Sequence, residues 1–178
     1  MTFEERVQSR QLVYQGGLVQ VERQEVTLPD QTTATREIVR HQPAVAMLMI
    51  TAQHKMIVEQ QWRAATGGLT VEIPAETMDQ AAVRELNEET RLTAQHLEAV
   101  AQFYTSPGFT DELMKLYVAT GLSAVATAFP QDPDEQIRLI KLDLATAVSQ
   151  VQTGQIQDAK TVMAIWYWQS HPELGVEA

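Results

Sequence analysis

The chain contains no cysteine, so disulfide bonds, thiolate zinc sites and cysteine nucleophiles are all excluded. Basic residues are also scarce, because 13 Lys and Arg against 23 Asp and Glu give a formal net charge of −10. With no dense basic patch, a surface for nucleic acid is not expected. The apolar run at 44–50 has the length of a strand, and the polar first ten residues do not form a signal peptide. The sequence therefore predicts a cytoplasmic protein with no nucleic-acid or membrane partner.

Most familiar catalytic motifs are missing as well. The chain has no G-x-S-x-G elbow, P-loop or G-x-G-x-x-G fingerprint, and its four histidines include no H-x-x-x-H pair. An acidic protein that acts on anionic phosphates would need metal ions to mediate the contact. Candidate chemistry is therefore sought among the carboxylates.

Apolar material for a core is present, since 44% of the 178 residues are hydrophobic. Alternating residues at 11–14, 18–28 and 35–41 predict an antiparallel β-meander at the N-terminus. Such a meander is weak on its own, so we expect it to pack on the main domain or on a second subunit. The predicted division is an N-terminal subdomain at 1–41, suited to dimerisation, and a main domain at 42–178.

The main domain alternates strand and helix signals. Strands are predicted at 44–51, 55–62, 69–73, 97–104, 112–120 and 136–142. Asp143 and Asp158 are predicted to cap two helices near the C-terminus. This pattern indicates an α/β protein.

An acidic helix is predicted after Pro74, because Thr77 and Gln80 match a capping box. In a helix, Glu85, Glu88 and Glu89 share one face within about one turn. Three carboxylates so close repel one another. They fit either a solvated surface or a site for a hard cation such as Mg²⁺ or Mn²⁺.

Several stretches resemble one enzyme family. The run R-E-L-N-E-E-T at 84–90 is similar to the core of the Nudix box, and V-E-I-P-A at 71–75 resembles the segment that precedes it in ADP-ribose pyrophosphatases of that superfamily. Weaker similarities occur, in the family's order, at 35–41, 59–63, 106–112 and 154–161. The resemblance therefore spans nearly the whole chain.

The resemblance implies an α/β/α sandwich around a mixed sheet, with the glutamate helix on one side. It also implies bound Mg²⁺ or Mn²⁺, with Glu85 and Glu89 as ligands, Glu88 as a ligand or orienting group, and the carbonyl of Ala75 as a backbone ligand. These ions would neutralise the pyrophosphate and activate water. Glu85 is thus assigned to catalysis as well as to the metal.

Other positions take roles from the same resemblance, each beside an ordinary alternative. Glu112 matches the loop glutamate that resembling enzymes use as general base or extra ligand, and Asp111 competes with it. Arg63 is assigned to a substrate phosphate and Arg36, more weakly, to substrate binding. Glu112 and Arg63 fit an exposed surface residue about as well, whereas Arg36, on a half-exposed strand, fits a solvated arginine better.

The sequence also departs from the family pattern. The glycine that should follow Ala75 and its short loop are missing, so that Glu76 follows at once. Glu76 suits the positive end of the helix dipole, and it could reach Arg84 or a metal. Arg91 stands where a left-handed glycine would end the helix, at a cost of about 1 kcal/mol.

Two functions follow. One is a Mg²⁺-dependent hydrolase that cleaves the pyrophosphate of ADP-ribose or a similar nucleoside diphosphate sugar to a nucleoside monophosphate and a sugar phosphate. The alternative is a catalytically impaired Nudix-fold protein that binds nucleotides or regulates a partner. The clustered carboxylates favour the enzyme, and the meander together with the resemblance favours a homodimer.

Overall fold

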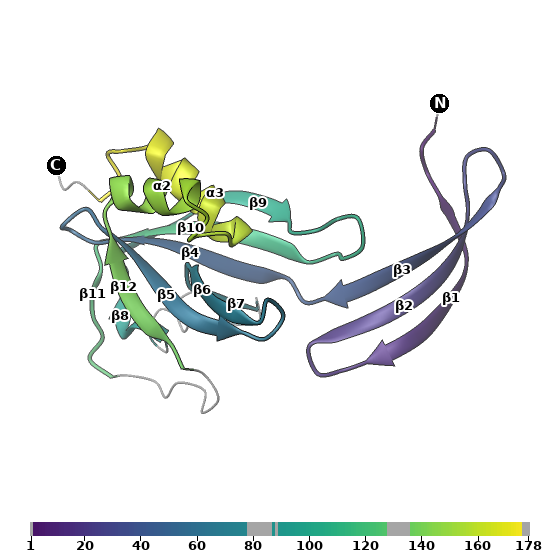
Figure 1. Cartoon of the computed structure of the whole chain (residues 1–178), viewed down its shortest axis with the longest axis horizontal. Coiled ribbons are helices and arrows are strands. Elements are labelled where there is room, and N and C mark those ends of the chain that lie inside the picture. The colour runs from purple at the N-terminus through teal and green to yellow at the C-terminus, as the bar shows by residue number, and fades with distance from the viewer. Residues whose placement is uncertain (1, 78–86, 88, 128–135, 176–178) are drawn as a thin grey trace. The chain divides into compact units, whose positions relative to one another are not determined.

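The computed structural model describes residues 2–77, 87, 89–127 and 136–175. The chain divides into two compact units, Met1–Pro43 with Phe103–Met114 and Ala44–Gln102 with Lys115–Ala178. Figure 1 shows the order of their elements. No described helix is both long enough and apolar enough to cross a bilayer.

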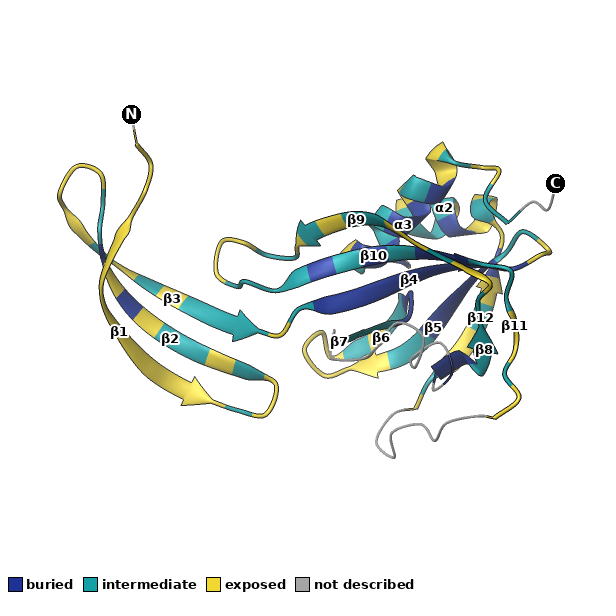
Figure 2. Cartoon of the chain, turned by 180° about the vertical axis from the view of Figure 1, so that it is seen from behind, coloured by how far each residue is buried: buried dark blue, intermediate teal, exposed yellow. Residues whose placement is uncertain are grey.

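The first unit contains the predicted meander. Strands β1 (Arg6–Gln15), β2 (Val19–Thr27) and β3 (Thr33–His41) form an antiparallel sheet in that order. Strand β1 begins at Arg6, whereas the sequence predicted a start at Gln11. The added residues belong to the strand because they pair with β2, although they show no apolar alternation. All of β1 is exposed, and within the three strands only Gln24 and Val26 on β2 are buried (Figure 2). A single sheet has no second layer in which to bury a face.

The second unit is built around a mixed seven-stranded sheet, as predicted. Its path is β12-β5-β4-β10-β9, with β6 beside β5 and β7 beside β4. The strands are β4 (Ala44–Ile50), β5 (Met56–Arg63), β6 (Gly68–Glu72), β7 (Ala75–Thr77), β9 (His96–Tyr104), β10 (Leu113–Thr120) and β12 (Arg138–Leu142). The two-residue strands β8 (Leu92–Thr93) and β11 (Ser123–Ala124) pair with each other. The sequence did not predict β7, β8 or β11, since two or three residues are too few for a periodic pattern.

Strand β4 lies at the centre of the core. All of its residues are buried, as expected of a central strand with both faces covered (Figure 2). Met47 and Met49 of β4 pack with Ile57 and Ala119. This core fixes the strands from which the candidate site is built.

Helices α2 (Leu144–Gln152) and α3 (Ala159–Ser170) pack against each other, and α3 also contacts β4 and β6 (Figure 1). The Asp143 carboxylate accepts from Thr146 N at 2.8 Å and the Asp158 carboxylate from Thr161 N at 3.0 Å. Both predicted caps are therefore confirmed. The α3 side chain of Trp168 is fully buried, which anchors this helix in the core.

Candidate functional site

The segment that leads into the predicted glutamate helix is tightly held. Glu72 at the end of β6 is 3% exposed and Ile73 is 1% exposed. The carbonyl of Pro74 accepts from Met47 N at 2.9 Å, and Ala75 then pairs with Ala46 in register. The backbone of Ala75, a predicted metal ligand, is thus fixed against the central strand.

Only the end of the glutamate helix is described. Asn87, Glu89 and Thr90 are helical and buried, with Glu89 6% exposed. The Asn87 side chain donates to Thr127 O at 2.8 Å, which ties the helix end to the segment after β11. Arg84, Glu85 and Glu88, together with Gln80 of the predicted capping box, lie outside the described residues.

Arg91 ends this helix in the left-handed conformation that the sequence predicts. Its φ is 59°, and its backbone N–H donates to Asn87 O at 3.0 Å. Its own carbonyl accepts from Val125 N at 3.1 Å. Glu76, for which the sequence offered two roles, lies half-buried in β7 opposite Val45.

Arg63 at the end of β5 forms a two-point ion pair with Glu72. Its Nε donates to Oε1 at 2.9 Å and its Nη2 to Oε2 at 2.8 Å. The hydroxyl of Thr70 also donates to Oε1 at 2.5 Å. A contact between Arg63 and a substrate phosphate stays a prediction. The guanidinium that would make this contact already binds the Glu72 carboxylate along one edge.

A second cation reaches the same carboxylate from the start of α3. Lys160, 9% exposed, donates from Nζ to Glu72 Oε2 at 2.6 Å and lies 3.1 Å from Asp158 Oδ1. The hydroxyl of Thr161 donates to Asp158 Oδ2 and accepts from Ile73 N at 2.8 Å. We call the set formed by Arg63, Thr70, Glu72, Asp158, Lys160 and Thr161 the Glu72 cluster.

The electrostatics of the Glu72 cluster keep its central carboxylate ionised. Burial opposes the charge, but the hydrogen bonds and positive charges of Arg63 and Lys160, with the Thr70 hydroxyl, lower the pKa of Glu72 to about 2. The pKa of Arg63 is raised, chiefly by its hydrogen bonds to Glu72. The ion pairs therefore persist throughout the neutral range.

In the first unit, the loop between β9 and β10 is attached to β3. Asp111 Oδ2 accepts from Arg40 Nη1 at 2.8 Å, and Oδ1 accepts from His41 N at 3.0 Å. Burial raises the pKa of Asp111, but the bonds from Arg40 and His41 outweigh it, so that the pKa is lowered. Backbone bonds between Val39 and the loop at Phe109 and Asp111 complete the attachment.

Glu112, the predicted loop base, is half-buried beside Asp111. Its Oε2 accepts from the Thr105 hydroxyl at 2.6 Å, and its Oε1 lies 3.6 Å from His41 Nδ1. Unlike Asp111, it contacts no Arg or Lys side chain in the described part of the chain.

Arg36 on β3 pairs with Glu5, through Nε at 3.1 Å and Nη2 at 2.5 Å. Both side chains are about one-third exposed. A substrate contact for Arg36 stays a prediction.

Each unit also contains a pocket. One of about 340 Å³ lies over β5, β6, β12 and α2 and is lined by uncharged residues: Gln60, Leu69, Val71, Ile140, Leu142, Gln150 and Gln155. A smaller one, about 190 Å³, lies between the β1–β2 turn and the end of β3, where Arg40 and His41 line it. Without a cation in its lining, the larger pocket does not suit a phosphate.

The residues assigned to a metal fit a hard divalent cation by donor type. Glu85, Glu88, Glu89 and the Ala75 carbonyl offer only oxygen, which Mg²⁺ and Mn²⁺ prefer. Within the described ranges, no three His, Asp or Glu side chains converge as a metal-binding group. Two of the three glutamates fall outside those ranges.

Sequence reasoning missed the residues that hold the predicted ones in place. Lys160 and Thr161 were recognised only as part of a family-like stretch, and Thr105, Arg40 and His41 received no role. One signal was available, because Lys160 follows the capping residue Asp158 by two positions. It therefore lies in the first turn of α3, on the buried face of that helix.

Comparison with known proteins supports the resemblance. A family model described as the NUDIX domain matches residues 40–164. The chain is 39% identical over 173 residues to the methanol dehydrogenase activator of Bacillus methanolicus and 36% identical over 174 residues to the ADP-ribose pyrophosphatase of Bacillus subtilis (strain 168). Each alignment covers 94% of this chain and 94% of the relative.

The fold has its own counterpart among solved structures. A crystal structure of an ADP compounds hydrolase aligns with a TM-score of 0.82 over 96% of this chain and 97% of that one, at 16% identity. That likeness concerns the fold, and it confirms the predicted fold class. The chain therefore belongs to the Nudix family, among its ADP-ribose pyrophosphatase-like members.

Proposed function

We propose that this Nudix pyrophosphatase hydrolyses ADP-ribose or a similar nucleoside diphosphate sugar with the help of Mg²⁺ or Mn²⁺. Water adds to one phosphorus, the P–O–P bond breaks, and a nucleoside monophosphate and a sugar phosphate leave. The observation that carries the proposal is the 36% identity with an ADP-ribose pyrophosphatase over 94% of both chains. The glutamates of the Nudix box are all present within that span.

Four groups would hold the metal: the carboxylates of Glu85, Glu88 and Glu89 and the carbonyl of Ala75. When bound, the cation neutralises the pyrophosphate charge and lowers the pKa of water. The described members support the assignment, because Glu89 is buried at its helix end and the Ala75 backbone is paired with β4. A fixed backbone and a buried carboxylate suit a ligand set that must not relax.

Glu112 is the proposed general base, which accepts the proton of the attacking water. Asp111 suits this role less, because Arg40 and the His41 N–H stabilise its ionised form and lower its pKa. Thr105 donates to one oxygen of Glu112 and leaves lone pairs on the other. Asp111 then serves to hold the loop.

Arg63 is proposed to bind a substrate phosphate, and Arg36 to contribute to substrate binding. Arg63 Nη1 makes no hydrogen bond to any residue that the structure describes, while Nε and Nη2 are engaged by Glu72. The Arg63 side chain is 43% exposed. One edge of the cation is thus available to an anion.

A hydrolysis assay tests the proposal. Purified protein is incubated with and without Mg²⁺ on ADP-ribose, other nucleotide sugars and dinucleoside polyphosphates, and monophosphate release is measured. We expect Mg²⁺-dependent release from nucleotide sugars, and its loss in Glu89→Gln. Glu98→Gln, at an exposed position of β9, is the matched control.

The assay also separates the two functions that the sequence raised. Turnover that does not respond to Glu89→Gln contradicts the assigned role of the Nudix box. Nucleotide binding without turnover, measured by calorimetry, would instead support the binding or regulatory protein. Similarity to a pyrophosphatase along the chain favours hydrolysis.

A further inference from the structure

Lys160 is a buried lysine to which the proposed reaction assigns no role. It lies in the first turn of α3, 9% exposed. A buried ammonium is costly unless it is paired and hydrogen-bonded. Here it is paired twice, to Glu72 Oε2 at 2.6 Å and to Asp158 Oδ1 at 3.1 Å. Its Nζ is therefore held at one point beside the Glu72 carboxylate.

The Glu72 carboxylate is held at both oxygens. Oε1 accepts from Arg63 Nε and from the Thr70 hydroxyl, while Oε2 accepts from Arg63 Nη2 and from Lys160 Nζ. Arg63 alone could follow the carboxylate as it turns about its last bond. Thr70 and Lys160 approach from β6 and α3, and they fix the plane of the carboxylate.

The position of Arg63 follows from that plane. Two parallel N–H···O bonds orient a guanidinium as well as attract it. Because the Arg63 side chain is 43% exposed and the Glu72 side chain is 5% exposed, the buried partner orients the exposed one. The remaining nitrogen, Nη1, then points away from the bonded edge in a fixed direction.

The start of α3 is itself anchored to β6. Asp158 caps the helix by accepting from Thr161 N, and the Thr161 hydroxyl accepts from Ile73 N at 2.8 Å. Ile73 is the residue after Glu72. The ammonium and the carboxylate are therefore carried by two segments that cannot shift independently.

We propose that Lys160 is a positioning residue for the substrate phosphate, which it serves by fixing Glu72 and through it the guanidinium of Arg63. The proposal rests on the proposed function, in which Arg63 binds that phosphate. It gives the family-like stretch at 154–161 an indirect role in substrate binding. Lys160 itself touches no substrate.

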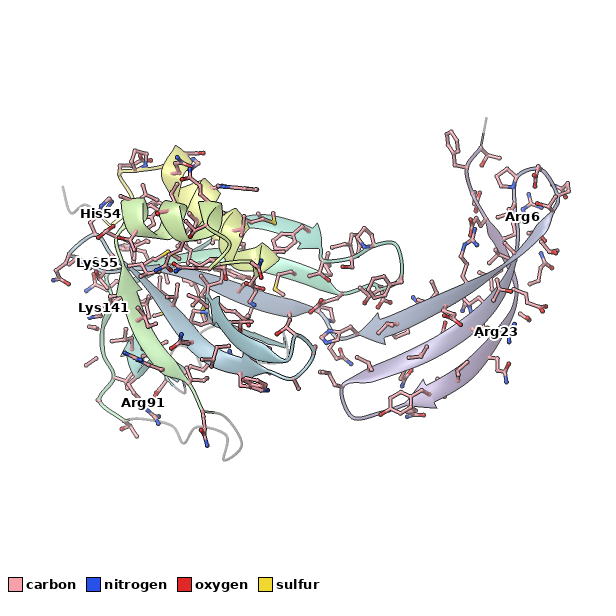
Figure 3. The ribbon with its side chains drawn as sticks, viewed as in Figure 1. Arg6, Arg23, His54, Lys55, Arg91 and Lys141 are labelled. Atoms are coloured by element: carbon pink, nitrogen blue, oxygen red, sulfur yellow. The ribbon has the colours of Figure 1, made fainter. Side chains whose placement is uncertain are left out.

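Kinetics test the proposal in the full chain. Lys160→Met keeps an unbranched apolar side chain, one atom shorter than lysine, but removes the charge. We expect KM for ADP-ribose to rise about tenfold with kcat changed less than about twofold, because a binding contact is weakened in ground and transition states alike. Lys160→Arg should restore most of the affinity. Lys141→Met, at an exposed position of β12 (Figure 3), is the control and should change neither constant.

A double-mutant cycle separates positioning from stability. In an Arg63→Ala background, Lys160→Met should raise KM no further, because both changes act on one contact. Additive effects in the cycle, or a lower melting temperature with unchanged KM, would overturn the proposal. If Lys160→Met does not fold, Lys160→Gln replaces it in the same comparison.

A spectroscopic measurement keeps the inference separate from the proposed reaction. The Nε–H signal of Arg63 is followed in a ¹⁵N–¹H spectrum of arginine side chains and assigned with Arg63→Lys. Lys160→Met should shift this signal and speed its exchange with water, whereas Lys141→Met should not. An unchanged signal overturns the positioning role even if the protein hydrolyses ADP-ribose. Failure to hydrolyse any nucleotide sugar overturns the proposed function, while the signal still decides whether Lys160 positions Arg63.

Discussion

Glu72 combines deep burial with full ionisation, because Arg63 and Lys160 both pair with it and Thr70 adds a third donor. A buried carboxylate without such partners would be destabilising by several kcal/mol. Removing one partner of a buried ion pair is also destabilising, because the other charge is then buried without a partner. Glu72 is therefore a point where stability and the proposed site depend on the same side chain.

The pH dependence of stability is the first prediction. The pKa of Glu72 is about 2 in the folded chain against an ordinary 4.5. Because the folded value is lower, Glu72 stabilises the fold above pH 4.5, and this contribution, on the order of 3 kcal/mol, is lost as pH falls from 4.5 towards 2. In urea unfolding at about pH 7 and about pH 3.5, Glu72→Gln should lose less stability on acidification than the parent chain. Equal losses would contradict the prediction.

The second prediction distinguishes the two loop carboxylates. Glu112→Gln should lower kcat by about a hundredfold or more, as expected on removal of a general base. Asp111→Asn should lower it less than about tenfold, because the amide can keep one bond to β3. Steady-state kinetics with ADP-ribose measure both. A larger effect of Asp111→Asn would make Asp111 the base.

At the scale of elements, caps and turns follow local rules. Asp143 and Asp158 begin helices where the sequence predicts, since an aspartate side chain can bond the free N–H groups of the first turn. Arg91 ends a helix in the left-handed region without a glycine. Another such position, Gln31 with a φ of 70°, lies in the turn between β2 and β3.

The third prediction concerns that turn. Gln31 is exposed, and its backbone N–H donates to Leu28 O at 2.9 Å. The hydrogen bond favours the left-handed conformation, and the Cβ of the side chain disfavours it. Gln31→Gly should raise the free energy of unfolding by about 0.5 kcal/mol, because relief of the left-handed strain exceeds the entropy that glycine adds to the unfolded chain. Gln20→Gly, on extended β2, should lower it instead. Denaturant unfolding measures both, and a loss of stability in Gln31→Gly would contradict the prediction.

At the scale of the molecule, the meander and the main sheet differ in how they bury apolar surface. The seven-stranded sheet has helices against it, whereas β1 exposes Leu12, Val13 and Tyr14, each more than half exposed. Exposed apolar side chains in a row are typical of an interaction surface. They support the predicted dimerisation role of residues 1–41, which stays a proposal.

The fourth prediction tests that role. Light scattering should show twice the mass of one chain, and Leu12→Asp or Val13→Asp should shift the protein towards the monomer, since an aspartate in an apolar interface is left unpaired. Gln11→Asp, in the same strand, is the control. A monomeric parent chain, or a dimer that neither variant weakens, would contradict the prediction.

The sequence by itself determined most of the elements, and it supplied the residues to which a site is assigned. Apolar alternation and the apolar run at 44–50 placed the longer strands of both sheets, and capping aspartates placed α2 and α3. The spacing of Glu85, Glu88 and Glu89 indicated a cation site. These signals are local, because a strand, a cap or a helical face involves residues only a few positions apart. The family resemblance assigned roles but not partners.

Tertiary structure decided which residues support those roles. Lys160 reaches Glu72 across 88 positions, and Arg40 reaches Asp111 across 71. No periodic pattern links positions so far apart, since their contact exists only once β6 meets α3, and β3 meets the loop after β9. The sequence could therefore name Arg63, Asp111 and Glu112 as candidates. Only the packed fold gives each of them the neighbour that sets its orientation or its charge.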